Sequence, residues 1–165
     1  MIFLFLLAAA APCSVLPDDF CFSPAGHCDE RLVALFAKAE HTIDVAIYSL
    51  NRASIVDALI EASERGVVVR VLLDNLQSHN AREIKQLRKL NKAGIESHHA
   101  HHRGIMHAKV AIVDGRWAES GSFNFTDPAT EYNDEVMSVL DCPAVAERFE
   151  AEFSTRWSAA RKAEQ

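Results

Sequence analysis

The stretch with the clearest chemistry runs from residue 107 to residue 124 and follows the pattern H-x-K-x4-D-x6-G-S-x-N. His107 supplies a nucleophilic imidazole, and Lys109 supplies a fixed positive charge. Ser122 and Asn124 add two neutral side chains that form hydrogen bonds. Together these are the groups that an attack on a phosphodiester requires when no metal ion takes part.

The residues after His107 predict how its neighbours are positioned. The segment 109–113 is apolar and rich in β-branched residues, which indicates a buried strand. Because residues two apart on a strand point to the same side, His107 and Lys109 are expected to face one pocket. The pair Asp114-Gly115 favours a tight turn, after which residues 116–119 are expected to return as the next strand.

The same spacing applies to the second half of the motif. Ser122 and Asn124 are two residues apart and are expected to share one face. Phe123 and Phe125 alternate with them and are expected to anchor this segment in the core.

With these spacings the chain resembles the phospholipase D superfamily, whose mark is the HKD motif followed by G-S-x-N. The segment Asn133-Asp134-Glu135 is similar to the N-x-E that follows in the family's small nucleases. The resemblance runs roughly from Phe20 to Trp157 and is nearest to the small single-motif bacterial EDTA-resistant endonucleases, with the mitochondrial phospholipase D-like nucleases next. The matching motif positions are His107, Lys109, Asp114, Gly121, Ser122 and Asn124.

The resemblance implies that His107 is a catalytic nucleophile that forms a phospho-histidine intermediate. A second histidine must protonate the leaving oxygen and then deprotonate the attacking water. The chain has one H-x-K motif in 165 residues, which suit a single domain. The resemblance therefore implies a homodimer whose active site lies on the two-fold axis, where the two copies of His107 meet.

The resemblance also implies roles for the other polar residues. Lys109 and Asn124 would surround the phosphoryl oxygens, and Ser122 would donate a further hydrogen bond, so these three residues are expected to bind the substrate phosphate. Glu135 is expected to hold the Nδ1 proton of His107 and so set its tautomer.

The motif aspartate has a different expected role. Asp114 lies at a turn and an odd number of residues from His107, so we expect it to be structural and to pair with a nearby cation. The chain lacks the clustered carboxylates that a Mg²⁺ site needs. No metal or cofactor is therefore expected, and activity should persist in EDTA.

The N-terminus predicts export. Residues 2–11 are apolar but too few to span a bilayer comfortably, and small residues follow them. This pattern indicates a signal peptide within residues 1–17, followed by a phospholipase D-like phosphodiesterase domain over residues 18–165. The expected location is periplasmic or secreted, and the alternative is an uncleaved membrane anchor.

The cysteines fit an exported protein. Cys21 and Cys28 flank a turn-rich loop and are expected to form a disulfide. The alternatives are a zinc site that uses His27 or later histidines, and free thiols.

The net charge of the chain bears on whether its partner is a nucleic acid. The net charge of −6 is unusual for a nucleic-acid binder, which usually carries a basic face. Four basic residues recur at helical spacing and could follow a phosphate backbone, although a solvated helix face is the simpler interpretation. They are Lys85, Arg88, Lys89 and Lys92.

The alternation of strands and helices predicts an α/β sandwich with a mixed, mostly parallel sheet flanked by helices. Strands are expected at 42–48, 67–73 and 95–97, and helices at 53–63, 81–92 and 144–160. Asp44 interrupts an apolar strand and is expected at a solvated edge. The histidines at 98, 99, 101 and 102 are expected in an exposed loop before the motif, although they could also line the substrate groove or bind a metal.

These observations favour a nuclease that acts on DNA or RNA. A phospholipase D that releases lipid head groups is the main alternative, because both substrates are phosphodiesters. A phosphodiesterase of broad specificity and a catalytically weak nucleic-acid-binding module are further alternatives. The motif does not distinguish DNA from RNA.

Overall fold

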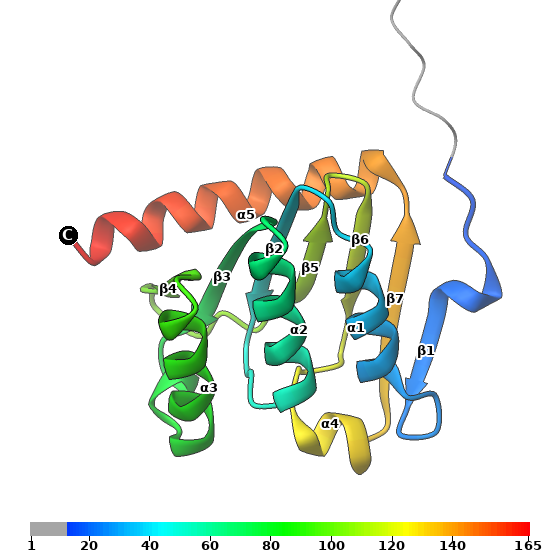
Figure 1. The fold of residues 1–165 in the computed structure, drawn as a ribbon, viewed down its shortest axis with the longest axis horizontal. Helices are drawn as coiled ribbons and strands as arrows, with labels where there is room; N and C mark the ends of the chain where they lie inside the picture. The colour runs from blue at the N-terminus through cyan, green and yellow to red at the C-terminus, as the bar shows by residue number, and fades with distance from the viewer. Residues whose placement is uncertain (1–12) are drawn as a thin grey trace, which may run out of the picture.

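The computed structural model describes residues 13–165. Within them the chain forms one seven-stranded sheet in the order β1-β7-β6-β5-β2-β3-β4, with helices on both faces (Figure 1). The strands are β1 (Phe20–Ser23), β2 (Thr42–Ile47), β3 (Val68–Asp74), β4 (Glu96–Ala100), β5 (Lys109–Val113), β6 (Trp117–Gly121) and β7 (Glu135–Asp141). The helices are α1 (Cys28–Ala37), α2 (Ala53–Glu64), α3 (Ala81–Lys92), α4 (Asp127–Glu131) and α5 (Pro143–Ala163), with short 3-10 turns η1 (Pro17–Asp19) and η2 (Gln77–His79).

The sheet is mixed, but its balance differs from the prediction. β2 pairs in parallel with β3, and β3 with β4, whereas the other four neighbouring pairs are antiparallel. The α/β sandwich with a mixed sheet is therefore confirmed, and the expectation of a mostly parallel sheet is wrong. Parallel neighbours need a crossover helix, which α2 and α3 supply. β5, β6 and β7 are joined instead by the turn at Asp114-Gly115 and by the segment that contains α4, both of which reverse the chain.

Hydrophobic spacing predicts the central elements closely. The ends of α2, α3, β2 and β3 differ from the predicted ends by no more than one residue. Gly66 and Gly94 follow α2 and α3 with φ of +94° and +77°, a left-handed conformation that glycine adopts without strain, and so end these helices. β1, β7, α1 and α4 are not among the predicted elements.

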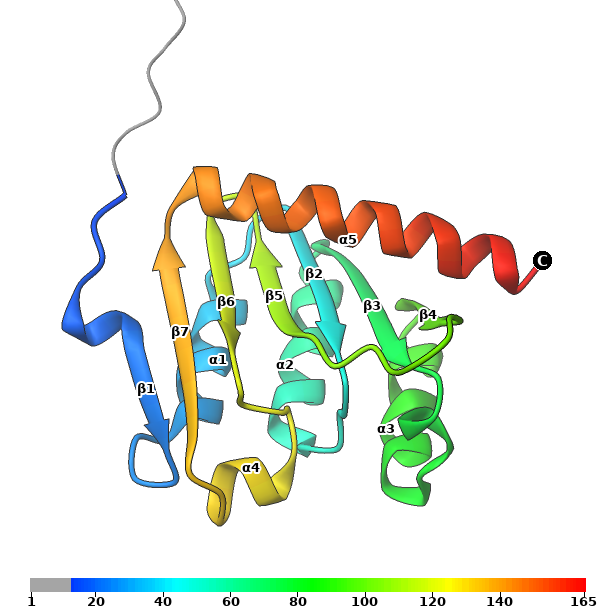
Figure 2. The same ribbon diagram turned by 180° about the vertical axis from the view of Figure 1, so that it is seen from behind.

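The two faces of the sheet are covered unequally. α1, α2 and α3 lie on one face, and the long α5 crosses the other face from β7 toward β4 (Figures 1 and 2). The larger core lies on the side of α1 and α2, and a smaller one lies beneath α5 around Phe153 and Trp157. The largest fully buried side chains of the first core include Leu32, Phe36, Ile43, Phe123 and Phe125.

Asp44 lies beneath α5 rather than at a solvated edge. Its side chain on the interior strand β2 is buried, and the Arg70 guanidinium binds both carboxylate oxygens at 2.5 and 2.6 Å. Arg70 also binds Glu150 of α5 at 3.0 Å and lies 5.0 Å from the centroid of the Phe153 ring. Burial raises the pKa of Asp44 to about 6, although Arg70 acts in the opposite direction. The prediction of a solvated edge is wrong because α5, distant in sequence, covers this strand.

Two disulfides lie in the described chain. Cys21 pairs with Cys28 across a Cα–Cα distance of 5.7 Å, which is the pair that the sequence indicates. Because both sulfurs are in this bridge, neither Cys21 nor Cys28 is a thiolate that could bind zinc beside His27. Cys13 pairs with Cys142, which no local pattern predicted, because 129 residues separate them.

The predicted signal peptide covers residues 1–17. The apolar segment 2–11 lies outside the described residues. Residues 13–17, which the sequence places before the domain, are attached to it through the bridge from Cys13 to Cys142. Within residues 13–165, no helix combines the length and the apolar character that crossing a bilayer requires.

Glu119 of β6 is a carboxylic acid in the apolar interior. It is fully buried, and neither carboxylate oxygen has a hydrogen-bond partner among the described residues. Burial raises the pKa of Glu119 well above the usual range, and the nearby backbone of Ala111 offsets this only in part. The folded protein therefore favours the neutral form of this side chain.

We predict that Glu119→Gln becomes more stable than the wild type as the pH rises. In the unfolded chain Glu119 ionises near pH 4.3, whereas the folded chain keeps it protonated to higher pH. The free energy of unfolding of the wild type therefore falls as the pH rises from the unfolded pKa toward the folded pKa of Glu119. The loss is about 1.4 kcal/mol for each unit by which folding raises the pKa. Urea unfolding at about pH 5 and about pH 8 measures the difference in free energy of unfolding. Exposed Glu61→Gln is the control, and a Glu119→Gln difference that does not change with pH would contradict the prediction.

Candidate active site

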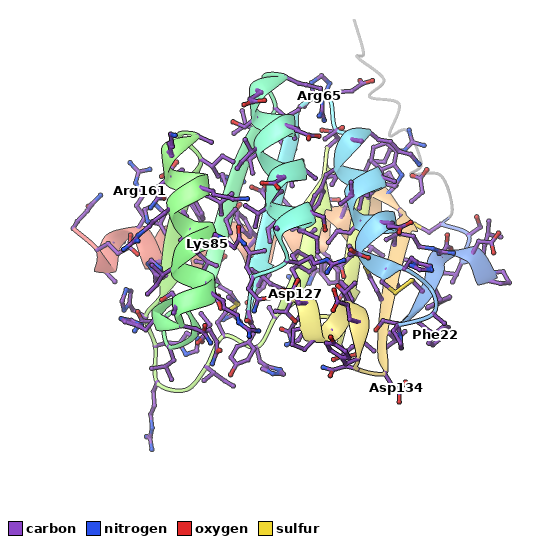
Figure 3. The ribbon with its side chains drawn as sticks, turned by 60° about the horizontal axis from the view of Figure 1, so that its bottom comes forward. Phe22, Arg65, Lys85, Asp127, Asp134 and Arg161 are labelled. Atoms are coloured by element: carbon purple, nitrogen blue, oxygen red, sulfur yellow. A yellow bond between two sulfur atoms is a disulfide. The ribbon has the colours of Figure 1, made fainter. Side chains whose placement is uncertain are left out.

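The motif residues meet at one end of the sheet. His107 leads into β5, Lys109 begins that strand, and Glu135 begins β7, while Ser122 directly follows β6. Because β6 is antiparallel to both β5 and β7, these strand ends lie together. This is the lower end of the sheet in Figure 1, and Figure 3 brings it forward, with Asp127 of α4 labelled.

The side chains of Lys109 and His107 lie together, as expected for residues two apart on a strand. Lys109 is only 5% exposed, and its Nζ lies 3.0 Å from the carbonyl oxygen of His107 and 3.3 Å from its Nδ1. The His107 side chain remains exposed. Burial lowers the pKa of Lys109, while the carboxylate of Glu135 acts in the opposite direction. The pair thus combines an accessible imidazole with a cation held partly out of water.

Tyr48 belongs to this group, although the motif does not include it. The centroid of its ring lies 4.5 Å from that of the His107 imidazole, and Lys109 Nζ lies 5.0 Å from the same ring centroid. The sequence signal was a tyrosine directly after the apolar strand β2. Only the pairing of β2 with β5 shows that this position adjoins the motif.

Glu135 contacts Ser122 rather than His107. The Ser122 hydroxyl donates to Glu135 Oε2 at 2.5 Å, and the Asn133 amide donates to Oε1 at 3.0 Å. No hydrogen bond among the described residues joins Glu135 to His107, so the predicted role is not what the single chain shows. The reason is the strand order, because β6 lies between β5 and β7 and places Ser122 nearer to Glu135.

The G-S-x-N segment is held closely against β7. A Cβ on Gly121 would come within 2.1 Å of the carbonyl oxygen of Val136, so only glycine fits there. Phe123 and Phe125 are fully buried, as their alternation predicts. Asn124 lies between them, and its buried Oδ1 has no hydrogen-bond partner among the described residues.

Arg52, which the sequence did not single out, supports this segment from behind. Its guanidinium binds Asp29 at 2.9 Å, Asp127 at 3.2 Å and Glu131 at 2.7 Å. Its backbone N–H donates to the Phe125 carbonyl oxygen at 2.9 Å. Burial works against the charged form, but the three carboxylates raise the pKa of Arg52 above its ordinary value. Arg52 therefore links α1 and α4 to the loop that carries Asn124.

Asp114 lies at the opposite end of β5 and is structural. Its carboxylate accepts backbone N–H groups of Glu40, His41 and Thr42 at 2.9, 2.8 and 2.8 Å. Burial would raise the pKa of Asp114, but these hydrogen bonds lower it below its ordinary value. The structural role follows the prediction, whereas the expected cation is replaced by backbone amides.

The histidines before the motif are more ordered than an exposed loop. His98 and His99 belong to β4, and His98 binds Glu96 at 3.0 Å and Glu164 at the end of α5. The His98 ring also meets the edge of Trp157 at a centroid distance of 4.6 Å. These two histidines hold α5 against the sheet, and only the other two follow the strand.

The basic residues of α3 remain largely solvated. Lys89 pairs with Asp57 at 2.8 Å, while Lys85, Arg88 and Lys92 are exposed. Lys85 is labelled on α3 in Figure 3.

A cavity of about 300 Å³ opens beside His107, between the segment that leads into β5 and helix α5. Its walls are mainly apolar, with Arg156 and Glu152 among the lining residues. The apolar lining includes Ile105, Met106, Val110, Phe149 and Phe153. In residues 13–165, no group of three or more histidine, cysteine, aspartate or glutamate side chains is placed to hold a metal ion.

Comparison with known proteins places this fold and motif in a family. Residues 32–157 match the family described as "Cardiolipin synthase, PLD-like domain". A mitochondrial cardiolipin hydrolase of Xenopus tropicalis is 31% identical over 144 residues, which are 86% of this chain and 68% of that protein. A phospholipase D of Rickettsia conorii is 36% identical over 129 residues, 78% of this chain and 64% of that protein.

Solved structures with a similar fold support the same family. The phospholipase D family member Nuc from Salmonella typhimurium superposes with a TM-score of 0.83 at 30% identity, over 89% of this chain and 95% of that one. NucT from Helicobacter pylori shares the fold, with a TM-score of 0.75 at 24% identity over 84% of this chain and 94% of that one. The chain belongs to the phospholipase D superfamily, and its class of chemistry is that of a phosphodiesterase.

We predict that Asp114→Asn destabilises the fold without removing turnover from the folded protein. The substitution removes the charge that three backbone N–H groups meet, so we expect a loss of about 1 to 3 kcal/mol in the free energy of unfolding at neutral pH. Since folding lowers the pKa of Asp114, this contribution is present above about pH 4 and is lost as the pH falls further.

Urea unfolding and phosphodiester turnover per folded molecule measure the two effects. Asp57→Asn, which removes an exposed ion pair with Lys89, is the matched control and should cost about 0.5 kcal/mol or less. If Asp114→Asn has the same free energy of unfolding as the wild type, or if its folded molecules lose turnover, the structural role is wrong.

Proposed function

We propose that this protein is a metal-independent endonuclease that hydrolyses DNA or RNA through a phospho-histidine intermediate. The observation that carries the proposal is the exposed His107 imidazole with the buried Lys109 ammonium 3.3 Å from its Nδ1, at the end of the sheet where Ser122 also lies. The near-complete length match with Nuc, together with the resemblance to small EDTA-resistant endonucleases, supports a nucleic-acid substrate.

In the proposed reaction, an imidazole nitrogen of His107 attacks phosphorus, and the bond from phosphorus to the leaving oxygen breaks. The leaving oxygen takes a proton from the imidazolium of His107 in a second copy of the chain. That imidazole, now neutral, removes a proton from water, and the water oxygen displaces the first histidine from phosphorus. No metal ion enters either step.

The other site residues would stabilise charge rather than transfer protons. The Lys109 ammonium lies beside the nucleophile and would bind a phosphoryl oxygen as negative charge develops there. The Asn124 side-chain NH2 would donate to another phosphoryl oxygen. Its buried Oδ1, which has no partner among the described residues, would accept a hydrogen bond from a donor of a second copy. The Ser122 hydroxyl already donates to Glu135, so these two would act as a unit.

The second histidine requires a homodimer with the active site at the two-fold interface. His107 is exposed in the single chain, so it is accessible to a second copy. Ile105 and Val136, near the same end of the sheet, are also exposed apolar side chains that an interface could cover. Glu135 could then reach the imidazole of the partner rather than its own.

The two disulfides favour export to an oxidising compartment, which we propose to be the periplasm or the secreted medium. An uncleaved N-terminal anchor is the alternative. Recovery of the chain from the cytoplasm with reduced cysteines would contradict export.

We predict that the purified full chain cleaves single-stranded DNA, duplex DNA or RNA in excess EDTA, and that His107→Ala lowers this turnover by about a thousandfold or more. His107→Ala should retain the wild-type melting temperature because the side chain is exposed. Gel analysis of the cleaved polymer and circular dichroism measure the two quantities.

Light scattering on the same preparation tests the dimer. An active protein that is monomeric throughout would contradict the two-histidine reaction. Binding of nucleic acid without turnover of any phosphodiester would contradict the enzyme and favour a binding module.

A phospholipase D that releases lipid head groups is the second candidate function. It is favoured by the apolar cavity of about 300 Å³ that His107 itself lines, because one substituent of a phosphodiester bound at His107 would lie there. The names of the frog and Rickettsia relatives, a cardiolipin hydrolase and a phospholipase D, point the same way.

We predict that Phe149→Glu separates the two candidates. If the cavity holds an acyl chain, a carboxylate there should lower head-group release from phosphatidylcholine vesicles by about tenfold or more, because burying a charge is unfavourable. Turnover of bis(p-nitrophenyl) phosphate should stay within about twofold of wild type, since it carries no acyl chain. Phe20→Glu, on β1, is the matched control outside the cavity. Equal loss on both substrates, or no loss on vesicles, would remove the support that the cavity gives to a lipid substrate.

A further inference from the structure

Tyr48 contacts both the nucleophile and the cation of the proposed reaction. Its ring and the His107 imidazole are inclined at 54° with centroids 4.5 Å apart. Lys109 Nζ lies 5.0 Å from the centroid of the same ring. One aromatic side chain outside the H-x-K and G-S-x-N motifs therefore contacts both the nucleophile and the cation beside it.

Strand pairing determines the position of Tyr48. Ile47 on β2 lies opposite Lys109 on β5 in the antiparallel register. The backbone N–H of Tyr48 donates to the carbonyl oxygen of Ala108 at 2.8 Å, which extends this pairing beyond the strand. Tyr48 is thus hydrogen-bonded to the residue between His107 and Lys109, which ties its backbone to theirs.

The hydroxyl end of Tyr48 is also held. The Gln77 side-chain amide donates to the Tyr48 hydroxyl oxygen at 2.9 Å. The buried carboxylate of Asp74 accepts the backbone N–H of Gln77 at 3.1 Å through one oxygen and that of Met106 at 2.8 Å through the other. A single carboxylate therefore fixes both the residue that holds Tyr48 and the residue directly before His107.

These contacts have physical consequences for both partners of the ring. The tilted contact between rings restricts rotation of an imidazole that is otherwise exposed. The negative face of the tyrosine ring attracts the ammonium and favours the charged form of Lys109, against the effect of burial. Both effects prepare the site before substrate binds, which is the main way that positioning lowers a barrier.

We propose that Tyr48 is a positioning residue whose ring holds the His107 imidazole and the Lys109 ammonium in the relative placement that attack on phosphorus requires, with Gln77 holding the ring. This inference rests on the proposed phosphodiesterase reaction of the same site. It adds Tyr48, Gln77 and Asp74 to the residues on which turnover depends. Tyr48 acts through its neighbours and need not touch the substrate.

The test compares three variants of the full chain with bis(p-nitrophenyl) phosphate as the probe. Tyr48→Leu keeps an apolar side chain but removes the aromatic face, and we expect kcat to fall by about 30-fold with KM within about twofold. The alkaline limb of its pH–kcat profile should move to lower pH by roughly half a unit, because loss of the aromatic face lowers the pKa of Lys109. Tyr48→Phe keeps both ring contacts and loses only the hydrogen bond from Gln77, so kcat should fall by no more than about three- to fivefold.

Gln77→Ala provides a test that remains valid if Tyr48→Leu does not fold. It removes only the tether to the Tyr48 hydroxyl, so we expect kcat to fall by about three- to fivefold with an unchanged melting temperature. Tyr132→Leu is the matched control, since that side chain is 75% exposed and, among the described residues, no aromatic or cation–π contact joins it to His107 or Lys109. It should behave as the wild type in kcat and in pH profile.

The outcomes separate the inference from the proposed function. If the wild type turns over the probe and Tyr48→Leu keeps both kcat and the alkaline limb, the inference is wrong while the enzyme stands. If Tyr48→Phe is as slow as Tyr48→Leu, the hydroxyl acts rather than the ring, and the proposed positioning is also wrong. If Tyr48→Leu does not fold, an unchanged kcat in Gln77→Ala overturns the inference. A wild type inactive on this probe and on every nucleic acid and lipid tried would overturn the function, and the inference with it.

Discussion

The arrangement of the site depends on an ammonium group that is almost withdrawn from water. Lys109 is 5% exposed at the start of an interior strand, where a lone charge is unfavourable. Its neighbours reduce this cost: the carbonyl oxygen and imidazole of His107, the ring face of Tyr48 and the field of Glu135 all favour a cation. A charge held in this way needs little reorganisation when negative charge develops beside it.

The scaffold holds the site through carboxylates that bind backbone amides or a guanidinium. Asp74 binds the amide before His107, and Arg52 joins α1 and α4 to the segment that carries Asn124. Asp114 performs a similar task at the far end of β5, where it binds the segment that enters β2. The aspartate in the motif's name therefore stabilises the frame of the strand and lies at the opposite end of β5 from His107 and Lys109.

Much of the fold follows from local patterns in the sequence. The spacing of hydrophobic residues predicts the ends of β2, α2, β3 and α3 to within one residue. The alternation of polar and aromatic residues around Asn124 predicts that Phe123 and Phe125 lie in the core. The pairing of Cys21 with Cys28 is also local, because a turn brings the two thiols together. The same patterns did not predict β1, β7, α1 or α4. They also predicted a mostly parallel sheet, which is wrong because the direction of pairing depends on strands distant in sequence.

By itself, the sequence determined the family, the motif and the adjacency of the His107 and Lys109 side chains, since each of these rests on residues close together along the chain. Only the tertiary structure decided that Asp44 is buried against Arg70, that Glu135 contacts Ser122, and that Tyr48 lies beside His107. It also decided that Cys13 and Cys142, which are 129 residues apart, come together. The physical reason is the same in each case. Spacing along the chain fixes the side to which a residue points, whereas its neighbours are set by strand order, register and the path of α5.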